Sequence, residues 1–590
     1  MDIISAALDS KLLRHPRLRR YRSLVREDLT ATYSRDIQKW LVVAPIIGVV
    51  TGLVVTGIAI TILDVIWNAM LPIYMAHHWM MVVGLLIGFT IAGLIMRYRT
   101  PNPNEHSTEE IIRSYHEHRG DIDIQPFWWK LLAAVATVGS GGSCALEGPG
   151  IYAGGAIGSW LWTKLKRLRL EPRDRRIMLI SGAAAGMAAV FRAPLTGLVF
   201  ALEMPYKDDL AHEALLPSLI SSVVAYSTLI SIAGAEPLFG FAATNAPGFQ
   251  AHDLPWAALL GFGIGLIALV FDITFRRVRT FFIASRIPHP LKLAIGGLGT
   301  ALCGIAFVSF FDSPLIPIGP NYEAVRYILS HRMPAHVLLA FAGFKLAATI
   351  CSLGVGGVSA MFVPLLLSGA AIGRAYAFAV VGGPQFGLYA AVGMAAFIAA
   401  GYKAPLTAVV FVAEAAGGHA FLIPSLIGAA VAYAVSGEAS VSGDQHLHEA
   451  ARLAELSGRT VRDVMQQQVV SVSAAATLRE FAAAVAANQR HTIYPVADAG
   501  GIGGTISASD LGRVPPEKWD TVTAGETANR DAVCVDTDCD LGEALRLLVR
   551  ERGAQMLLVV DDTGKLAGIV TKTDILRGVN IGGPAPNSDQ

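Results

Sequence analysis

A single carboxylate, Glu147, stands in a glycine-rich stretch between two apolar runs. The stretch is GSGGSCALEGPG, residues 139–150, and Glu147 is its only charged residue. Its glycines let the backbone approach another group closely, and Pro149 is typical of the first turn of a helix. A helix N-terminus presents unpaired N–H groups and about half a positive charge, which suits an anion. The pattern therefore predicts a small-anion site that Glu147 occupies when ionised and leaves when protonated.

The composition of the chain indicates a membrane protein. Of its 590 residues, 53% are hydrophobic and 16% are charged, whereas soluble domains carry about a quarter charged residues. About 20 apolar residues suffice to span a bilayer. Apolar runs lie at 41–63, 79–96, 131–146, 177–203, 214–234, 255–272, 291–311, 336–353, 388–414 and 420–436. We therefore expect an integral, multi-pass protein of the plasma or inner membrane.

Basic residues are distributed in a way that orients the chain. The segment 11–22, KLLRHPRLRRYR, is strongly basic and precedes the first apolar run. By the positive-inside rule it stays in the cytoplasm, and the basic segment 164–176 fits the same side. We expect both termini to be cytoplasmic. A nucleic-acid-binding arm is the alternative interpretation, which we reject beside a first membrane span.

The sequence has no feature that indicates an enzyme or a metal site. The five cysteines have no metal-ligand spacing. His106, His116 and His118 stand near glutamates, but without regular spacing. No nucleophile–base pair or P-loop motif is visible. We expect no catalysis, no metal and no required cofactor.

The membrane part contains an internal repeat. The segment GMAAVFRAPLTGLVFALE, 186–203, matches AFIAAGYKAPLTAVVFVAE, 396–414, with Arg192 opposite Lys403. Repeats with Gly- and Pro-interrupted helices are typical of transporters that bind substrate at the repeat interface.

The repeat extends upstream with nearly the same offset. Residues 148–160 match residues 363–376, so a whole half-domain is repeated. This places 145–150 opposite 360–365, as two helix N-termini that face one site.

After residue 437 the apolar runs stop. The segment 436–445 is small and polar, as in a linker. Two similar units follow, each with a strand, a capping-box helix start and a strand–turn–strand pair. The capping-box pairs are Thr477 with Glu480 and Asp540 with Glu543.

The two units close on matching motifs, Gly504-x-x-Ser507-x-x-Asp510 and Gly568-x-x-Thr571-x-x-Asp574. This repeated β-α-β-β-α pattern resembles a tandem pair of CBS domains. The resemblance implies one module with clefts, which in many such modules bind adenine nucleotides such as ATP or AMP. It makes Asp510 and Asp574 the ligands of the ribose hydroxyls, with Ser507 and Thr571 beside them. The alternative is that both aspartates cap helices and that the module only dimerises or couples mechanically.

The loop around Glu147 resembles a motif of the CLC chloride channels and transporters, G-[RK]-E-G-P. The repeated [RK]-A-P-L-T segments and GVSAMFVP, 357–364, resemble other motifs of that family. The resemblance implies a homodimer in which each subunit has its own anion pathway, with chloride as substrate. It implies that Glu147 is the gating glutamate. It also implies that the amides of Met361 and Phe362 help to hold the central anion, with Gly148 beside them.

The sequence departs from this family at the selectivity loop, which usually reads G-S-G-[IV]-P-E. The equivalent stretch is PNEHSTEEIIRSYH, 103–116. The best alignment replaces the hydroxyl that faces the anion with His106, and Ser107 is one step away. A charged histidine would attract anions. The alternative is a surface histidine in a polar loop near the mouth.

Two further departures concern proton coupling and an inner tyrosine. Proton-coupled members often have a second carboxylate after the one that ends the A-P-L-T-G helix, but Glu203 is followed here by Met204. Methionine cannot carry a proton, which argues for passive conduction, and Glu203 and its repeat mate Glu414 are then structural. The tyrosine that usually follows the last membrane helix is absent, and His446 is the nearest candidate. Chloride is the expected anion, with nitrate and fluoride left open.

The expected architecture is an all-α polytopic membrane domain with an inverted repeat and broken helices, followed by a cytoplasmic α/β tandem CBS module. An N-terminal segment, the membrane domain, a linker, two CBS domains and a tail are expected at 1–37, 38–436, 437–458, 459–515, 529–580 and 581–590. The expected function is a passive, glutamate-gated chloride channel regulated by the CBS domains. The alternatives are an H+/Cl− antiporter and a nucleotide-sensing membrane receptor without transport.

Overall fold

The computed structural model describes the chain from residue 34 to residue 575, with gaps. The described ranges are 34–103, 107–165, 170–234, 249–331, 333–382, 386–415, 421–445, 460–467, 469–487, 493–498, 501–530, 532–550, 556–561, 565–571 and 573–575. The chain divides into two units, residues 1–447 and 448–590. Each unit is described by itself.

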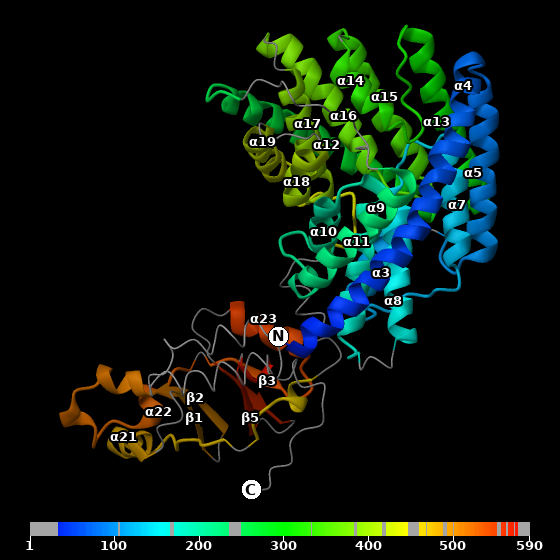
Figure 1. The fold of residues 1–590 in the computed structure, drawn as a ribbon. Coiled ribbons are helices and arrows are strands. Elements are labelled where there is room, and N and C mark those ends of the chain that lie inside the picture. Colours follow the sequence, from blue (N-terminus) through cyan, green and yellow to red (C-terminus); the bar gives the residue numbers. More distant parts are fainter. Residues whose placement is uncertain are drawn as a thin grey trace, which may run out of the picture. The chain divides into compact units, whose positions relative to one another are not determined.

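The first unit is built of helices (Figure 1). Within its described residues, seven helices are long and apolar enough to cross a membrane, and shorter apolar helices accompany them. The elements are α3 Ser34–Ile60, η3 Thr61–Trp67, α4 Asn68–Ala76, α5 Met80–Arg99, α6 Ser107–His116, α7 Phe127–Gly139, α8 Glu147–Lys164, α9 Asp174–Phe191, α10 Pro194–Glu203, η5 His212–Ala214, α11 Leu215–Ala233, α12 Asp253–Ala284, α13 His289–Phe310, α14 Glu323–Ser330, α15 Ala335–Leu353, α16 Phe362–Tyr376, η7 Ala377–Val381, α17 Phe386–Tyr402, α18 Pro405–Ala415 and α19 Leu422–Val435.

Two of the predicted apolar runs are each broken into two helices. Run 177–203 forms α9 and α10, and run 388–414 forms α17 and α18. The breaks fall at Arg192 and Lys403, whose φ angles of 54° and 56° lie in the left-handed region. A proline begins the helix after each break, because it has no N–H to donate to a preceding turn. The expectation of broken helices is confirmed.

The run 131–146 does not form one continuous span, which corrects that prediction. Helix α7 has 13 residues and ends at Gly139. The glycine-rich stretch then forms a loop, and α8 begins at Glu147.

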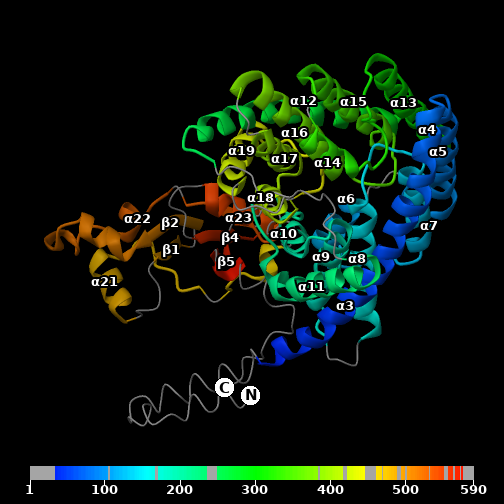
Figure 2. The same ribbon diagram turned by 45° about the horizontal axis from the view of Figure 1, so that its top comes forward.

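The two halves of the repeat pack their helices in the same way. A Cβ on Gly154 of α8 would lie 1.9 Å from the carbonyl oxygen of Gly182 on α9. A Cβ on Gly373 of α16 would lie 2.0 Å from the carbonyl oxygen of Tyr389 on α17. Small residues at such contacts let helix backbones approach closely in membranes. In Figure 2, α8 and α9 lie beside α3, and α16 and α17 lie beside α12, as the helix contacts also indicate.

Two glutamates, Glu203, which is buried, and Glu414, which is partly buried, cap helices across the repeat. Glu203, at the end of α10, accepts hydrogen bonds from the Thr407 backbone N–H at 2.9 Å and the Thr407 hydroxyl at 2.7 Å, in the first turn of α18. Glu414 of α18 does the same for Thr196 in the first turn of α10, at 2.8 and 2.7 Å. Both carboxylates satisfy helix N–H groups that lack intrahelical partners. This reciprocal arrangement supports the interpretation of Glu203 and Glu414 as structural.

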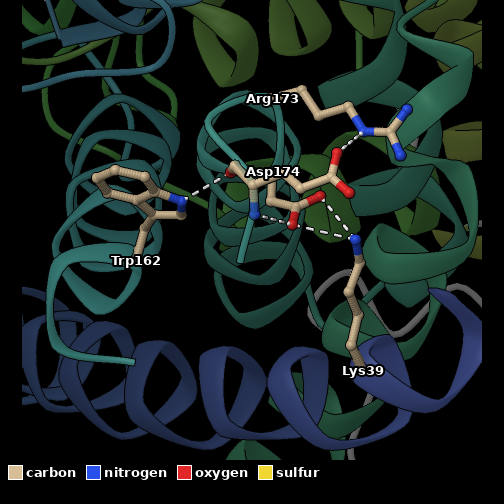
Figure 3. Close-up of polar contacts among 5 residues, drawn as sticks. Lys39, Trp162, Arg173 and Asp174 are labelled. Atoms are coloured by element: carbon tan, nitrogen blue, oxygen red, sulfur yellow. Dashed lines mark hydrogen bonds and ion pairs between the residues drawn. The ribbon is translucent and has the colours of Figure 1, made fainter. Parts of the chain in front are cut away.

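An ionic cluster ties the start of α3 to the start of α9 (Figure 3). The Lys39 ammonium lies 2.9 Å from Oδ1 of Asp174, which is 1% exposed. Asp174 Oδ2 also accepts the backbone N–H of Glu171 at 2.7 Å. The indole N–H of Trp162, at the end of α8, donates to the Glu171 carbonyl at 3.0 Å, and Arg173 pairs with the Glu171 carboxylate. The cluster thereby joins α3, α8 and α9.

Two small sheets are present among the described residues of the second unit. Strands β1 Ile493–Asp498 and β2 Gly501–Ser507 pair antiparallel. Strand β4 Met556–Val560 pairs parallel with β3 Cys534–Asp536 and antiparallel with β5 Leu566–Thr571. The helices are η9 Val461–Asp463, α21 Leu478–Ala487, η10 Ala508–Arg513, η11 Pro516–Lys518, α22 Ala524–Thr527 and α23 Leu541–Arg550. The expected α/β character of this part is confirmed.

Candidate anion site

Glu147 lies where two helix N-termini meet. It begins α8, it is fully buried, and its Oε1 accepts the backbone N–H of Phe362 at 2.6 Å. Phe362 begins α16. The preceding loops pair through the backbone, with the Ala145 N–H donating to the Ala360 carbonyl at 3.0 Å. The predicted opposition of 145–150 and 360–365 is confirmed.

Gly148 permits this close approach. A Cβ at Gly148 would lie 2.7 Å from the carbonyl carbon of Ser359 and 2.9 Å from the nitrogen of Ala360. Both distances are shorter than real Cβ contacts. Because Gly148 has no side chain, the two loops can meet at this point, and Gly148 contributes only backbone atoms to the site.

The Tyr402 hydroxyl is a part of the site that sequence reasoning missed. It accepts the Met361 N–H at 3.0 Å and interacts with the Glu147 carboxyl. Because the hydroxyl oxygen accepts that N–H, its own proton remains available to a carboxylate or an anion. Oε2 of Glu147 accepts no hydrogen bond within the described part of the chain.

The internal repeat carries a signal for Tyr402. The residue stands directly before Lys403-Ala-Pro-Leu-Thr, where the first half has Phe191 before Arg192. The rings of Phe191 and Tyr402 both contact the ring of Phe362, with centroids 4.9 and 5.9 Å away. Of these two matched aromatic residues only Tyr402 has a hydroxyl, so the two halves of the repeat differ at this position.

A small cavity adjoins Tyr402. Its volume is about 20 Å³, enough for one water-sized occupant. The Thr108 hydroxyl is buried and has no hydrogen-bond partner among the described residues. The lining residues are Thr108, Glu109, Phe275, Ser359, Ala360, Met361, Tyr402, Val441 and Ser442. The unpaired Thr108 hydroxyl beside such a space suits a small polar or anionic occupant.

Of the two residues predicted from the selectivity loop, the structure describes only Ser107. Ser107 is buried at the start of α6 but does not line the cavity, whereas its neighbour Thr108 does. His106 lies outside the described residues, as does His446. The lining residues that carry a hydroxyl are Thr108, Ser359, Tyr402 and Ser442, and the Ser359 hydroxyl donates to the Ala145 carbonyl.

The acidic group in the cavity wall is neutralised. Glu109 is 5% exposed, and both of its carboxylate oxygens contact the guanidinium of Arg279 on α12. A bidentate pair of this kind is a strong, oriented interaction. It reduces the repulsion that a free carboxylate would exert on an anion in the cavity.

A second, larger cavity has a volume of about 440 Å³. Its wall includes Tyr322, whose hydroxyl accepts the N–H of Leu146 at 3.1 Å. It also includes the charged residues Asp64, Arg192, Glu323 and Arg326. Residues that bond to the loop before Glu147 thus belong to the walls of both cavities.

Models of two known protein families match parts of this chain. The model of the voltage gated chloride channel family matches residues 87–437, more than half of the chain. This chain belongs to the CLC family. The CBS domain model matches residues 524–580.

Relatives and solved structures of CLC proteins include exchangers. The H(+)/Cl(-) exchange transporter ClcA of Yersinia pestis is 27% identical over 316 residues, 51% of this chain and 64% of the exchanger. The crystal structure of a slow cyanobacterial Cl−/H+ antiporter matches with a TM-score of 0.59 at 21% identity, covering 68% of this chain and 94% of that one. A CLC-type fluoride/proton antiporter matches with a TM-score of 0.57 at 21% identity, covering 71% and 100%. The two structures establish the shared fold.

In this CLC protein Met204 occupies a buried position, with 1% exposure, directly after the capping residue Glu203. Its carbonyl accepts a hydrogen bond from the Gln445 side chain at 3.1 Å. The thioether cannot exchange a proton, and the Glu203 carboxylate next to it is engaged by α18.

In the second unit of this CLC protein, both closing aspartates cap local structure. Asp510 Oδ2 accepts the Ser507 N–H at 2.8 Å and the Ser507 hydroxyl at 2.6 Å. Asp574 Oδ2 accepts the same pair of groups from Thr571, at 2.9 and 2.6 Å. Oδ1 of Asp574 accepts the Gln466 side chain at 2.8 Å. The capping role that the sequence left as an alternative is therefore present.

Proposed function

We propose that the protein conducts chloride passively and that the Glu147 carboxylate is the gate. The observation that carries this proposal is the hydrogen bond of 2.6 Å from the Phe362 N–H to Glu147. A helix N-terminus is an anion site, and here an anion that belongs to the protein fills it. Chloride reaches the Phe362 amide only when the carboxylate moves away. Protonation favours that movement because a neutral acid is held less strongly by N–H groups.

The hydroxyls of Thr108 and Tyr402 are proposed as ligands of the transported anion in the small cavity. Both line that cavity, and the Thr108 hydroxyl has no partner within the described residues. The Met361 amide donates to the Tyr402 oxygen, so the donors proposed for one anion are the two hydroxyl protons and the Phe362 amide once Glu147 has left it. His106 and Ser107 remain the ligands predicted from sequence, so a chloride-binding comparison of Thr108→Val with Ser107→Ala separates the two assignments.

Passive conduction is preferred because the inner proton acceptor is missing. Met204 stands where proton-coupled members often have a carboxylate, and Glu203 is engaged as a cap. Proton-coupled exchange is the second candidate, supported by the printed names of the exchanger relatives. In that case protons would reach Glu147 without an inner carboxylate.

We propose a homodimer with one pathway in each subunit, in the plasma or inner membrane, with both termini cytoplasmic. Repeat-related leucines support an apolar contact surface, since Leu195 of α10 and Leu406 of α18 are each 48% exposed in the single chain. Mass measurement of the protein in nanodiscs tests the dimer. A monomeric mass would overturn it.

The CBS part is proposed to regulate the pathway through an adenine nucleotide such as ATP or AMP. Binding would have to exchange the caps of Asp510 and Asp574 for ribose hydroxyls, with Ser507 and Thr571 close by. Titration of the full chain with ATP tests this role. ATP binding that survives Asp510→Ala and Asp574→Ala together would contradict the assigned site.

The deciding experiment uses purified protein in liposomes with chloride and pH electrodes. A chloride gradient is imposed, and both ion movements are recorded together. Rapid chloride loss without proton movement establishes a channel. Uphill proton movement in a fixed ratio to chloride establishes an antiporter. No anion movement at all would favour a nucleotide-sensing receptor that transports nothing.

A further inference from the structure

The side chain of Gln445 holds the backbone near the anion site. It lies in the segment that follows α19 and is 6% exposed. Its amide nitrogen donates to the carbonyl oxygens of Tyr402 at 3.0 Å, Met204 at 3.1 Å and Tyr206 at 3.3 Å. Its Oε1 accepts the Ser440 hydroxyl at 2.6 Å. An amide has two N–H donors, so these carbonyls share them, and one buried side chain joins α10 to α17.

The residues on both sides of Tyr402 contact the same segment. The Val441 N–H donates to the Gly401 carbonyl at 2.9 Å. The Lys403 ammonium donates to the Ser436 hydroxyl at 2.6 Å. The three consecutive residues Gly401, Tyr402 and Lys403 therefore each form a hydrogen bond with a residue of the segment 436–445.

The Tyr402 carbonyl needs such a partner. Carbonyls in the last turn of a helix have no intrahelical donor, and α17 ends at Tyr402. The chain turns into the left-handed region at Lys403, so no helical N–H follows to satisfy that carbonyl. Gln445 supplies the donor from another part of the sequence.

The same residue carries the hydroxyl that accepts the Met361 N–H at 3.0 Å. A ring with two rotatable side-chain bonds keeps its hydroxyl in place only if its backbone is fixed, since functional groups need support from neighbouring contacts. Movement of the Tyr402 backbone would carry the hydroxyl away from Met361 and from the small cavity.

We infer that Gln445 is a positioning residue of the anion site: it fixes the Tyr402 backbone and thereby sets where the Tyr402 hydroxyl meets the anion. This inference rests on the proposed role of that hydroxyl as an anion ligand. It concerns a residue that touches no transported ion itself. Its effect must pass through Tyr402.

A double-mutant cycle on the full-length protein tests this dependence. Chloride affinity is measured by calorimetry in detergent for the unmodified protein, Gln445→Leu, Tyr402→Phe and the double variant. We expect Gln445→Leu to weaken chloride binding by about two- to tenfold, the range of a neutral hydrogen bond. In the Tyr402→Phe background, the same change should have no further effect, because coupled residues are not additive.

Two further variants control the experiment. Ser221→Ala removes a buried hydroxyl that donates to the Ser181 carbonyl at 2.7 Å, far along the chain from Tyr402, and should leave chloride affinity unchanged. Gln445→Asn keeps the amide on a shorter side chain and replaces the leucine variant if that variant does not fold. It should reduce chloride affinity less than Gln445→Leu does, and again only when Tyr402 is present.

The outcomes separate the inference from the function it rests on. Equal losses from Gln445→Leu in both backgrounds, or no loss in either, would overturn the inference alone. An unchanged affinity in Tyr402→Phe would overturn the assignment of Tyr402 as a ligand, and the inference with it. Neither result bears on whether Glu147 gates the pathway.

Discussion

The Glu147 carboxylate and the Phe362 amide, 215 positions apart in the sequence, are joined by a hydrogen bond of 2.6 Å in the interior of the helical unit. The bond connects the first residue of α8 to the first residue of α16, its partner in the internal repeat. It places a titratable group of the protein on a backbone donor that suits a free anion. The gating proposal depends on this pair.

Neutralising Glu147 should open the pathway and remove its pH dependence. In the unmodified protein, falling pH protonates the carboxylate, so chloride flux should rise as pH falls. Glu147→Gln carries no charge at any pH and should give a high flux that is flat across the same range. Chloride efflux from liposomes at several pH values measures this. A pH dependence that persists in Glu147→Gln would remove Glu147 from the gate.

Removing the Thr108 hydroxyl should weaken chloride binding. A hydrogen bond to a charged group contributes about 1.5–3 kcal/mol, so Thr108→Val should raise the chloride Kd by about ten- to a hundredfold. Thr108→Ser keeps the hydroxyl and should bind nearly as the unmodified protein does. Calorimetric titration with chloride measures both variants. Equal affinity in the valine and serine variants would show that this hydroxyl does not meet the anion.

A side chain at Gly148 should separate the two loops of the site. The Cβ of Gly148→Ala would lie 2.7 Å from the Ser359 carbonyl carbon, and overpacking of this kind costs about 1–3 kcal/mol. We expect a lower Tm in detergent and a reduced chloride flux. Gly263→Ala on α12 is the matched control, because its Cβ would meet nothing within 4 Å. Similar losses in the two variants would contradict the close approach at Gly148.

Removing the charge of Glu203 should affect stability and leave ion coupling unchanged. Glu203→Gln keeps the shape of the side chain but weakens its bonds to Thr407, and loss of a helix cap costs about 1 kcal/mol. Thermal unfolding in detergent should show a lower Tm, and Glu414→Gln should have a similar effect on α10. The ratio of proton to chloride movement in liposomes should be the same as in the unmodified protein. A changed ratio would make Glu203 part of a proton pathway.

Much of the membrane fold could be read from local sequence patterns. Apolar runs of sufficient length predicted the membrane part, because the bilayer sets a minimum length for any span. The prolines after Arg192 and Lys403 lie where α10 and α18 begin. The run 131–146 was misassigned as a span because hydropathy alone does not separate a short helix from the glycine-rich loop that follows it.

The candidate site was only partly predictable. Glu147 was identified because its special setting is local: glycines, one charge and a proline within twelve letters, 139–150. Thr108 lies in the stretch aligned with the selectivity loop, and Tyr402 directly precedes Lys403-Ala-Pro-Leu-Thr. Both were missed because each becomes part of the site only when α6 and α17 pack near the loop before α16. The repeat alignment placed Tyr402 opposite Phe191, which was the one signal for it.

The sequence by itself determined the family, the internal repeat and the identity of the carboxylate that we propose as the gate, since these depend on residue types at short spacing. Only the tertiary structure decided which groups meet Glu147, that Glu203 and Glu414 cap each other's helices, and that Gln445 reaches Tyr402. Glu147 and Phe362 are 215 positions apart, Glu203 and Thr407 are 204 apart, and Gln445 and Tyr402 are 43 apart. Such contacts depend on how helices pack, and helix packing is set by side chains from many segments at once.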